Sequence, residues 1–121
     1  MRSNQTLRQR AADLQGYRCY YCGFPIWETD VSAFAKRYAI TERAARRFRS
    51  TAEHVQALGD GGKTNAENIV AACIFCNKTR HARPGRISAA AYLALVHGRL
   101  AAHRWHGAQF NKLIEFRHAR A

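Results

Sequence analysis

One stretch of the chain, from Glu53 to His81, gathers side chains suited to hydrolysing a phosphodiester bond. Such hydrolysis needs an activated water, a Lewis acid on the phosphate oxygens and a scaffold that aligns the two. His54 is the candidate base, because imidazole takes up a proton readily near neutral pH. Glu53 and Asn77 offer the hard oxygen atoms that magnesium and manganese prefer. Neighbouring side chains on a strand point to opposite faces, so Glu53 can reach a metal while His54 addresses the water.

These residues resemble the HNH endonucleases of the ββα-metal fold. The family pattern runs from Asp/Glu-His through a glycine-containing loop and an Asn to Cys-x-x-Cys-Asn. This chain has Glu53-His54, then Asn68, then the segment from Cys73 to Asn77, in the same order. Asn68 lies 14 residues and Asn77 lies 23 residues after His54, which is similar to the spacing in the HNH domain of CRISPR effector nucleases. Glu53 stands where Asp is more common.

The resemblance implies a role for each of these residues. His54 is the general base, Glu53 and Asn77 bind a catalytic magnesium or manganese ion, and Asn68 braces the loop that carries the base. His81 follows Asn77 by four residues, so the two share one face of a helix. The colicin-type relatives have a His pair at this separation, which makes His81 a candidate metal ligand or phosphate contact. The implied products carry 5′-phosphate and 3′-hydroxyl ends.

The four cysteines form two Cys-x-x-Cys pairs, Cys19/Cys22 and Cys73/Cys76. Two such knuckles supply four thiolates to one tetrahedral zinc ion and leave no position open for water, so this zinc would be structural. The alternative is a pair of disulfides, which an extracellular domain would use. The N-terminus beginning at Met1 has no apolar run of the kind found in a secretory signal. We therefore expect a cytoplasmic protein whose cysteines bind zinc in a reducing compartment.

The 121-residue chain is strongly basic, with 20 Lys and Arg against 8 Asp and Glu and a formal net charge of +12. Residues 51–79 carry a net charge of −1, whereas 31–50 carry +5 and 80–121 carry +7. The basic flanks suit DNA phosphates, although a basic surface that only improves solubility has the same composition. Of the residues near the motif, Arg80 or His81 is expected to contact the scissile phosphate. The candidate DNA contacts are Arg43, Arg46, Arg47, Lys63, Lys78, Arg80, Arg83 and Arg86.

The sequence predicts a single α+β domain, with a small ββα-metal (HNH) core, a four-cysteine zinc site and additional flanking helices. Strands are expected at residues 51–58 and 68–72, and helices at 6–14, 32–38, 41–48, 74–82 and 88–103. Residues 1–50 would hold the N-terminal helix, the first knuckle and a basic helical insertion, 51–82 the core, and 83–121 a helical extension. No apolar run approaches the ~20 residues of a membrane span.

A helix-turn-helix is a second interpretation of residues 34–48. Small residues lie where such a motif packs its helices closely, which would place Arg43, Arg46 and Arg47 toward DNA. An inserted helical pair with a solvated basic face has the same pattern. Further along the chain, Trp105 is expected to anchor the core or a lid, and His106 to lie at the surface or to cap a helix.

Together the residues favour a metal-dependent HNH endonuclease that hydrolyses DNA, with a structural zinc and a catalytic magnesium or manganese ion. The competing class is a non-catalytic nucleic-acid-binding module that keeps the zinc and the basic surface. An RNA-directed nuclease is a weaker alternative, because no aromatic RNA-binding platform is recognisable. The sequence indicates neither an oligomeric state nor a target sequence.

Overall fold

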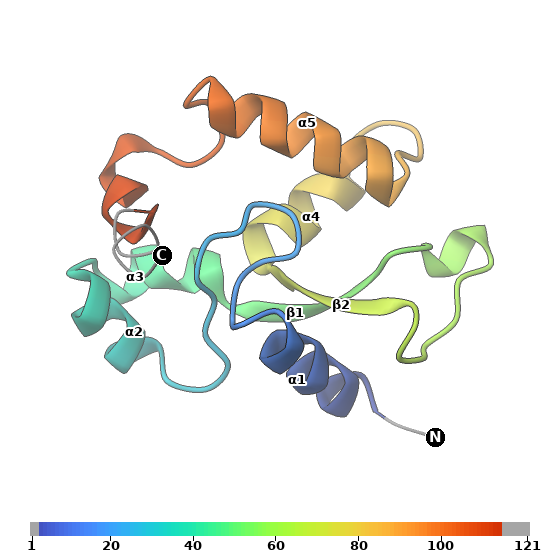
Figure 1. The fold of residues 1–121 in the computed structure, drawn as a ribbon, viewed down its shortest axis with the longest axis horizontal. Helices are drawn as coiled ribbons and strands as arrows, with labels where there is room; N and C mark the ends of the chain where they lie inside the picture. Colours follow the sequence, from blue (N-terminus) through green and yellow to red (C-terminus); the bar gives the residue numbers. More distant parts are fainter. Residues whose placement is uncertain (1–2, 115–121) are drawn as a thin grey trace.

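The computed structural model describes residues 3–114. Its helices are α1 (Asn4–Leu14), α2 (Val31–Tyr38), α3 (Glu42–Ala45), α4 (Ile74–Ala82) and α5 (Ala89–Ala101), and its strands are β1 (Ser50–His54) and β2 (Ile69–Cys73) (Figure 1). Short 3₁₀ turns occupy Arg46–Phe48, Leu58–Asp60 and Ala108–Phe110. Within the described residues no helix is long and apolar enough to cross a membrane. The predicted α+β class is confirmed, and β1, β2 and α4 in succession form the ββα unit.

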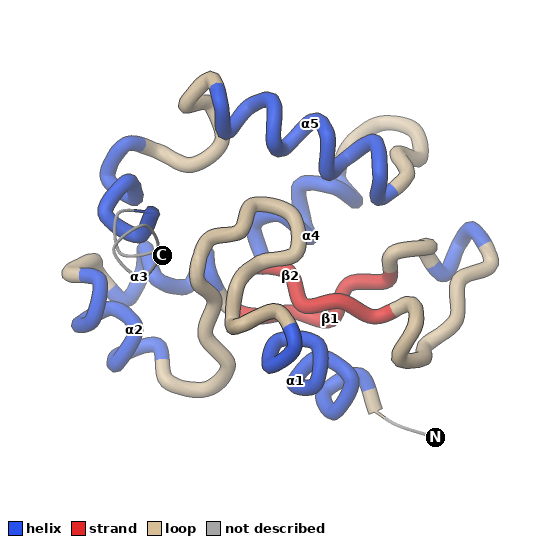
Figure 2. Tube along the Cα trace, in the orientation of Figure 1, coloured by secondary structure: helices blue, strands red, loops and turns tan. Residues whose placement is uncertain are grey.

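The two strands form one antiparallel sheet among the helices (Figure 2). The register pairs Ser50 with Cys73 and His54 with Ile69. The cysteine of the second knuckle and the candidate base therefore lie at opposite ends of the strand pair. α1 and α4 each pack against both strands, from below and from above in the view of Figure 1.

The outer edge of β2 is closed by the segment that follows α1. The Gln15 side chain donates to the carbonyl oxygen of Ala71 at 2.8 Å and accepts from the Ala71 amide at 3.0 Å. The backbone amide of Tyr20 donates to the same carbonyl at 3.0 Å. An exposed strand edge would otherwise leave these backbone groups unpaired. The contacts also fix the first knuckle beside the strand that ends in Cys73.

Polar side chains begin the helices at positions that leave backbone N–H groups unpaired. Hydrogen bonds from the first turns of α1, α2, α3 and α5 are accepted by Ser3, Asp30, Thr41 and Ser88, respectively. The cap of α2 is Asp30, whose carboxylate accepts from the Ala33 amide at 2.9 Å. That helix therefore starts one residue earlier than predicted.

Three helices end with a residue in the left-handed region of backbone conformation. Gly16 has this conformation after α1 (φ +65°), as expected for a glycine at a helix end. Ala39 after α2 (φ +54°) and His103 after α5 (φ +57°) adopt it with a side chain present. A Cβ disfavours this conformation, so the ends of α2 and α5 are strained.

The strands and α3 differ from the predicted boundaries. β1 ends at His54 and does not continue to Leu58, because Gln56 forms hydrogen bonds with the Asn68 side chain there. The helix predicted over residues 41–48 is a single α-helical turn followed by a 3₁₀ turn. A recognition helix needs several turns to present side chains in a major groove. The helix-turn-helix interpretation is therefore wrong.

An aromatic core joins the first knuckle to the C-terminal segment. Phe24, Phe48 and Phe110 are buried, and the ring centroid of Phe48 lies 5.8 Å from that of Phe24 and 5.1 Å from that of Phe110. α5 buries Tyr92 and Val96 on one face. The chain after α5 therefore returns to the domain and covers the region around the cysteines.

Candidate active site and metal centre

The four cysteines converge on one buried point. Their sulfur atoms all lie within 4.8 Å of one another, and the Cys22 and Cys73 sulfurs are 4.0 Å apart. A tetrahedral zinc site with Zn–S bonds of about 2.3 Å has sulfur separations of ~3.8 Å. Both the chemistry and the spacing of this cluster therefore fit zinc, and all four cysteines are unpaired by disulfides.

Hydrogen bonds to the sulfurs come from the surrounding chain. The Cys73 amide donates to Cys19 at 3.3 Å, the Cys76 amide to Cys73 at 3.4 Å, and the Trp105 indole to Cys76 at 3.3 Å. Burial raises the pKa of the Cys22 and Cys73 thiols. Burial acts in the same direction on Cys19, but hydrogen bonds from the other thiols hold the pKa of Cys19 below its ordinary value. Binding of a metal by this set must therefore release protons.

Glu53 lies at the centre of a second, largely buried group. Its side chain is 2% exposed, and its two carboxylate oxygens have different neighbours. One oxygen, Oε2, accepts from the Tyr21 hydroxyl at 3.0 Å and from the Arg80 guanidinium at 3.1 Å. The other, Oε1, lies 2.9 Å from His81 Nε2, and the His81 side chain is 44% exposed. Only Oε1 therefore faces the side of the site that solvent reaches.

Arg80 of α4 holds this group together through its guanidinium. Its guanidinium donates to Tyr21, to Glu53 and to the backbone carbonyls of His54, Val55 and Ile87 at 3.0 to 3.3 Å. The side chain is 4% exposed. The sequence-based assignment of Arg80 to the scissile phosphate is therefore wrong, because every face of its guanidinium is already used inside the protein.

The charges of Glu53 and Arg80, together with burial, determine the protonation of the groups in this network. Burial and the neighbouring Glu53 carboxylate raise the pKa of the Tyr21 hydroxyl well above its ordinary value, so Tyr21 remains a hydrogen-bond donor. Burial acts to lower the pKa of Arg80, but Tyr21 and Glu53 raise it above its ordinary value. Arg80 therefore remains a cation that balances the buried Glu53 carboxylate.

Asn77 lies beside Glu53 but its amide nitrogen faces β1. The nitrogen donates to the Thr51 hydroxyl at 3.1 Å and to the Ala52 carbonyl at 3.3 Å. Both partners can accept, so the amide oxygen of Asn77 points away from the strand. The structure thus brings together Glu53 and His81 directly, and Asn77 one helical turn before His81, with its oxygen available on the same helix.

His54 leaves β1 on the other face of the strand and contacts the loop between the strands. Its Nε2 atom lies 3.0 Å from the Thr64 hydroxyl. Asn68 holds the same loop, because its amide donates to the carbonyls of Gln56 and Lys63 at 2.9 and 2.8 Å and accepts from the Gln56 amide at 2.8 Å. This is the geometry expected of a residue that braces the loop beside a base.

The loop passes so close to itself that one position requires glycine. A Cβ added to Gly62 would lie 1.8 Å from the Gln56 carbonyl oxygen, which no side chain could accommodate. Beyond α4, the Arg86 guanidinium donates to the Gly59 carbonyl at 3.0 Å and pairs with the Asp60 carboxylate. A surface pocket of about 240 Å³ lies between this loop and His81. The site is therefore open on the side of His81.

The comparison with protein families agrees with this arrangement. Residues 43–83 match the family model described as HNH endonuclease. This segment is therefore similar to an HNH endonuclease domain. The match includes the ββα unit and all of the residues from Glu53 to His81, and it leaves the first knuckle outside. No similar chain was found among curated proteins or among solved structures.

Five of the eight candidate DNA contacts are exposed, whereas Arg47 is half-buried. Its guanidinium carbon lies 3.5 Å from the Phe75 ring centroid, and its Nε donates to His106 Nδ1 at 2.8 Å. Arg47 thus packs against Phe75 and His106 near the cysteine knuckles, and its assignment to DNA stays a prediction. Arg83 is half-buried and Arg86 is held by Asp60. The exposed candidates are Arg43, Arg46, Lys63, Lys78 and Arg86.

His106 is buried, contrary to the sequence-based expectation. Desolvation by burial and the adjacent Arg47 cation lower the pKa of His106 to about 3, so its ring is neutral. Sequence reasoning also missed Tyr21 and Thr64, which contact the candidate metal ligand and the candidate base. Tyr21 sits between the cysteines of the first knuckle and Thr64 in a polar loop, and neither position has a local pattern that would single it out.

Proposed function

We propose that this protein is a metal-dependent endonuclease that hydrolyses DNA phosphodiester bonds. The observation that supports it best is the pairing of Glu53 Oε1 with His81 Nε2 in an HNH-like ββα unit whose first strand also carries His54. One carboxylate, one imidazole and a separate base are the groups that a single-metal hydrolysis needs. Burying a carboxylate is energetically unfavourable, and a module that only binds nucleic acid does not need one.

Glu53 and His81 would hold the catalytic ion, with the Asn77 amide oxygen as the third candidate ligand. When bound, a magnesium or manganese ion supplies a Lewis acid that stabilises charge on the phosphate oxygens. Tyr21 and Arg80 occupy Glu53 Oε2, so Glu53 would offer a single oxygen in a fixed direction. The mixed oxygen and nitrogen set favours manganese over magnesium, because magnesium prefers oxygen ligands alone.

His54 would take the proton from the attacking water. Its Nε2 atom is engaged by the Thr64 hydroxyl, so Nδ1 is the atom that remains for the proton. Thr64 would act as a positioning residue that sets the orientation and the tautomer of the His54 ring. Asn68 would keep the loop with Thr64 in place through its three hydrogen bonds to Gln56 and Lys63.

The four cysteines would bind one structural zinc ion. With four thiolates as ligands, such a site has no open position for a substrate or a water. The zinc would join the first knuckle to the β2–α4 corner, and Trp105 would cover it from the C-terminal segment. Its contribution would therefore be to the fold and not to the reaction.

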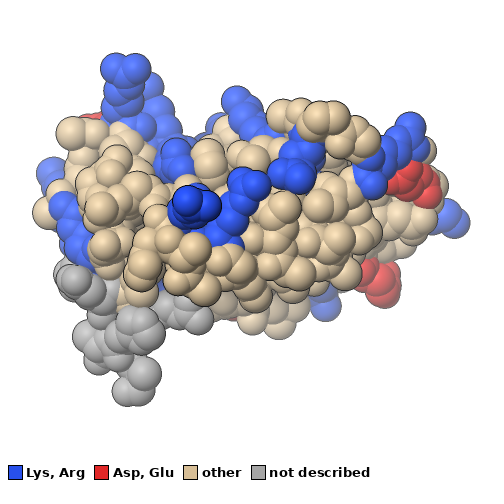
Figure 3. Space-filling model, turned by 90° about the horizontal axis from the view of Figure 1, so that it is seen from above, with Lys and Arg blue, Asp and Glu red and all other residues tan. Residues whose placement is uncertain are grey.

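DNA would be bound mainly through its phosphates. Figure 3 shows Lys and Arg spread over one face of the molecule, with Asp and Glu only toward its ends. Contacts of this kind position the duplex and carry no base information. Arg43, Arg46, Lys63 and Lys78 are exposed and would supply part of the phosphate contacts.

The test is nicking of supercoiled plasmid with manganese, with magnesium and with EDTA. We expect His54→Ala to lower the cleavage rate by a factor on the order of 100 to 10,000 while duplex affinity changes little. His97→Ala removes an exposed imidazole of α5 and is the matched control. Cleavage that survives EDTA, or equal rates for His54→Ala and the control, would contradict the proposal. Binding without cleavage by the wild type under all metal conditions would instead identify a non-catalytic module.

A further inference from the structure

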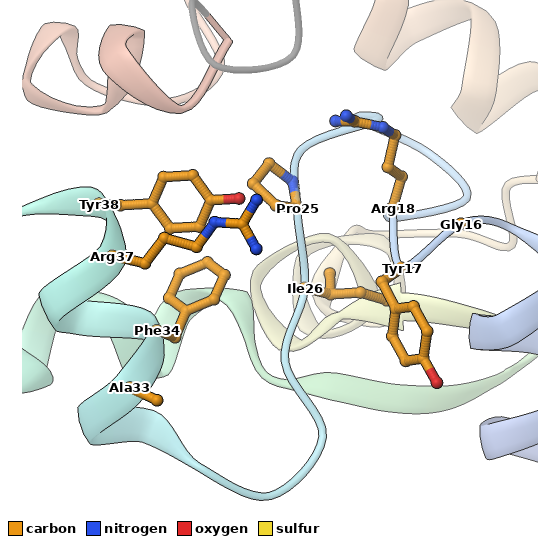
Figure 4. Close-up of a pocket in the computed structure, with 9 residues that line it drawn as sticks. All are labelled: Gly16, Tyr17, Arg18, Pro25, Ile26, Ala33, Phe34, Arg37 and Tyr38. Atoms are coloured by element: carbon orange, nitrogen blue, oxygen red, sulfur yellow. The ribbon is translucent and has the colours of Figure 1, made fainter. Parts of the chain in front are cut away.

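A groove of about 250 Å³ lies between α2 and the chain of the first knuckle, away from the catalytic residues. Figure 4 shows Phe34, Arg37 and Tyr38 of α2 on one side of it and Tyr17, Arg18, Pro25 and Ile26 on the other. The antiparallel bridge between Arg18 and Pro25 holds the second side in place. The groove is therefore built from two fixed elements.

The floor of this groove is apolar and its rim is cationic. Ile26, Phe34 and Tyr38 expose 4 to 8% of their surface and form the floor. The guanidinium of Arg37 lies between the two sides and points toward Pro25 in Figure 4. Of the residues that line the groove, none is a carboxylate. A ligand with a flat apolar part and a negative charge would match these surfaces, whereas a metal ion or an amine would not.

Among the described residues, the groove and the chain that follows α2 carry cations that form no ion pairs with carboxylates. Lys36, Arg43, Arg46 and Arg49 are exposed near it in the sequence, on and after α2. Across residues 3–114, the ion pairs involve Arg8, Arg80, His81 and Arg86, and none of them uses these four cations, Arg18 or Arg37. At the groove itself, Arg18 and Arg37 thus have no carboxylate partner within the described part of the chain, and cations without such a partner attract a polyanion.

Tyr17 adds an exposed aromatic ring beside this charge. It is 47% exposed and its backbone is in the left-handed region (φ +58°). Its amide donates to the Ala12 carbonyl at 2.8 Å, which fixes this conformation at the end of α1. A large aromatic residue held in a disfavoured conformation at the surface is the type of outlier that marks a binding site.

We propose that this groove binds one unpaired nucleotide of the nucleic acid that the domain cleaves. The base would lie on the floor formed by Ile26 and Phe34, under the Arg37 guanidinium, and Arg18 would contact the flanking phosphate. Stacking on aromatic and guanidinium groups accepts any base. A paired base inside a duplex cannot enter such a groove without leaving its stack. This inference rests on the proposed function in one respect, which is that the bound polymer is a nucleic acid.

The position of the groove gives it a separate role from cleavage. α2 and the loop between β1 and β2 lie toward opposite ends of the longest axis of the molecule (Figure 1). A nucleotide in the groove would therefore belong to a part of the substrate distant from the scissile phosphate. Bulged, gapped or frayed duplexes would be bound more tightly than perfect ones.

The experiment compares binding of a perfect duplex with binding of the same duplex carrying a single 2-aminopurine bulge. Stoichiometric zinc is present and magnesium and manganese are omitted throughout, so no cleavage is required. The variants are Arg37→Gln, which removes the stacking cation, and Ala33→Trp, which fills the groove from an exposed position on α2. Arg43→Gln removes an exposed arginine outside the groove and is the matched control. Thermal unfolding verifies that each variant is folded.

We expect the wild type to prefer the bulged duplex by about tenfold, since one stacked base contributes a factor of this order, and to quench the 2-aminopurine. Arg37→Gln and Ala33→Trp should abolish both effects, whereas Arg43→Gln should weaken both duplexes equally. Equal affinities of the wild type for the two duplexes, or equal effects of Arg37→Gln and Arg43→Gln, would overturn the inference. If free dAMP displaces both duplexes equally well from the groove, the ligand is a mononucleotide, and this result would also overturn the inference. If the wild type prefers the bulged duplex but does not nick plasmid, that result would contradict the proposed function and leave this inference standing.

Discussion

Replacement of Arg80 by Met should strongly destabilise the domain, because it removes the cation from a buried carboxylate. Glu53 is 2% exposed and Arg80 is 4% exposed, so water cannot replace the lost charge. Removing one partner of a buried ion pair costs about 3–5 kcal/mol. Three backbone carbonyls lose their donor in the same change, at His54, Val55 and Ile87.

The expected size of the effect follows from the difference between two single variants. Glu53→Gln leaves Arg80 with a neutral acceptor and its four other partners, so we expect a cost of about 1–2 kcal/mol. Arg80→Met should cost about 4 kcal/mol, which is a large part of the 5–15 kcal/mol stability of an ordinary domain. In the double variant the buried carboxylate is gone, and about 2–3 kcal/mol of the Arg80 cost should be recovered.

The assay is urea unfolding of the wild type, the two single variants and the double variant, followed by tryptophan fluorescence. Stoichiometric zinc is present, and magnesium and manganese are absent so that no ion binds Glu53. A coupling energy below about 0.5 kcal/mol would refute the reasoning, because it would mean that Arg80 stabilises the fold without balancing Glu53. Should Arg80→Met alone be unfolded, recovery of folding in the double variant gives the same answer.

Three further predictions concern the metal centre, acid stability and a helix end. Cys73→Ser should lose the zinc and much of the fold, because four thiolates close the site; elemental analysis that finds no zinc in the wild type, or an unchanged melting temperature in the variant, would contradict this. The His106 pKa of about 3 lies below the unfolded value of about 6.5, so the unfolded state binds the extra proton and stability should fall as pH drops from about 6.5 toward 3, by up to ~1.4 kcal/mol per pH unit. His106→Phe should unfold with a pH slope that is smaller by about one proton, and equal slopes for variant and wild type would dismiss His106 as the cause. Ala39→Gly should raise the free energy of unfolding by roughly 0.5–1 kcal/mol, because Ala39 has a φ of +54°; Ala90→Gly, at an exposed position inside α5, is the control and should lower it.

The chemistry of the site was predictable because it depends on short-range patterns. The two Cys-x-x-Cys turns, the adjacent Glu53 and His54 on one strand, and the four-residue interval between Asn77 and His81 each fix a local geometry. The α4 bounds, Ile74–Ala82, are equally local and agree with the prediction. The fold class and the HNH segment followed from these patterns.

The surroundings of the site were decided by the tertiary structure. Arg80 and Arg47 have the same side chain as the exposed Arg43, and only packing against Glu53 and Phe75 shows that the first two face inward. Whether a guanidinium meets water, a carboxylate or an aromatic ring depends on segments distant in the chain, because burial is a property of packed surfaces. The residue types and their spacing thus determined which chemistry is present, while long-range packing decided which cations remain free for a substrate.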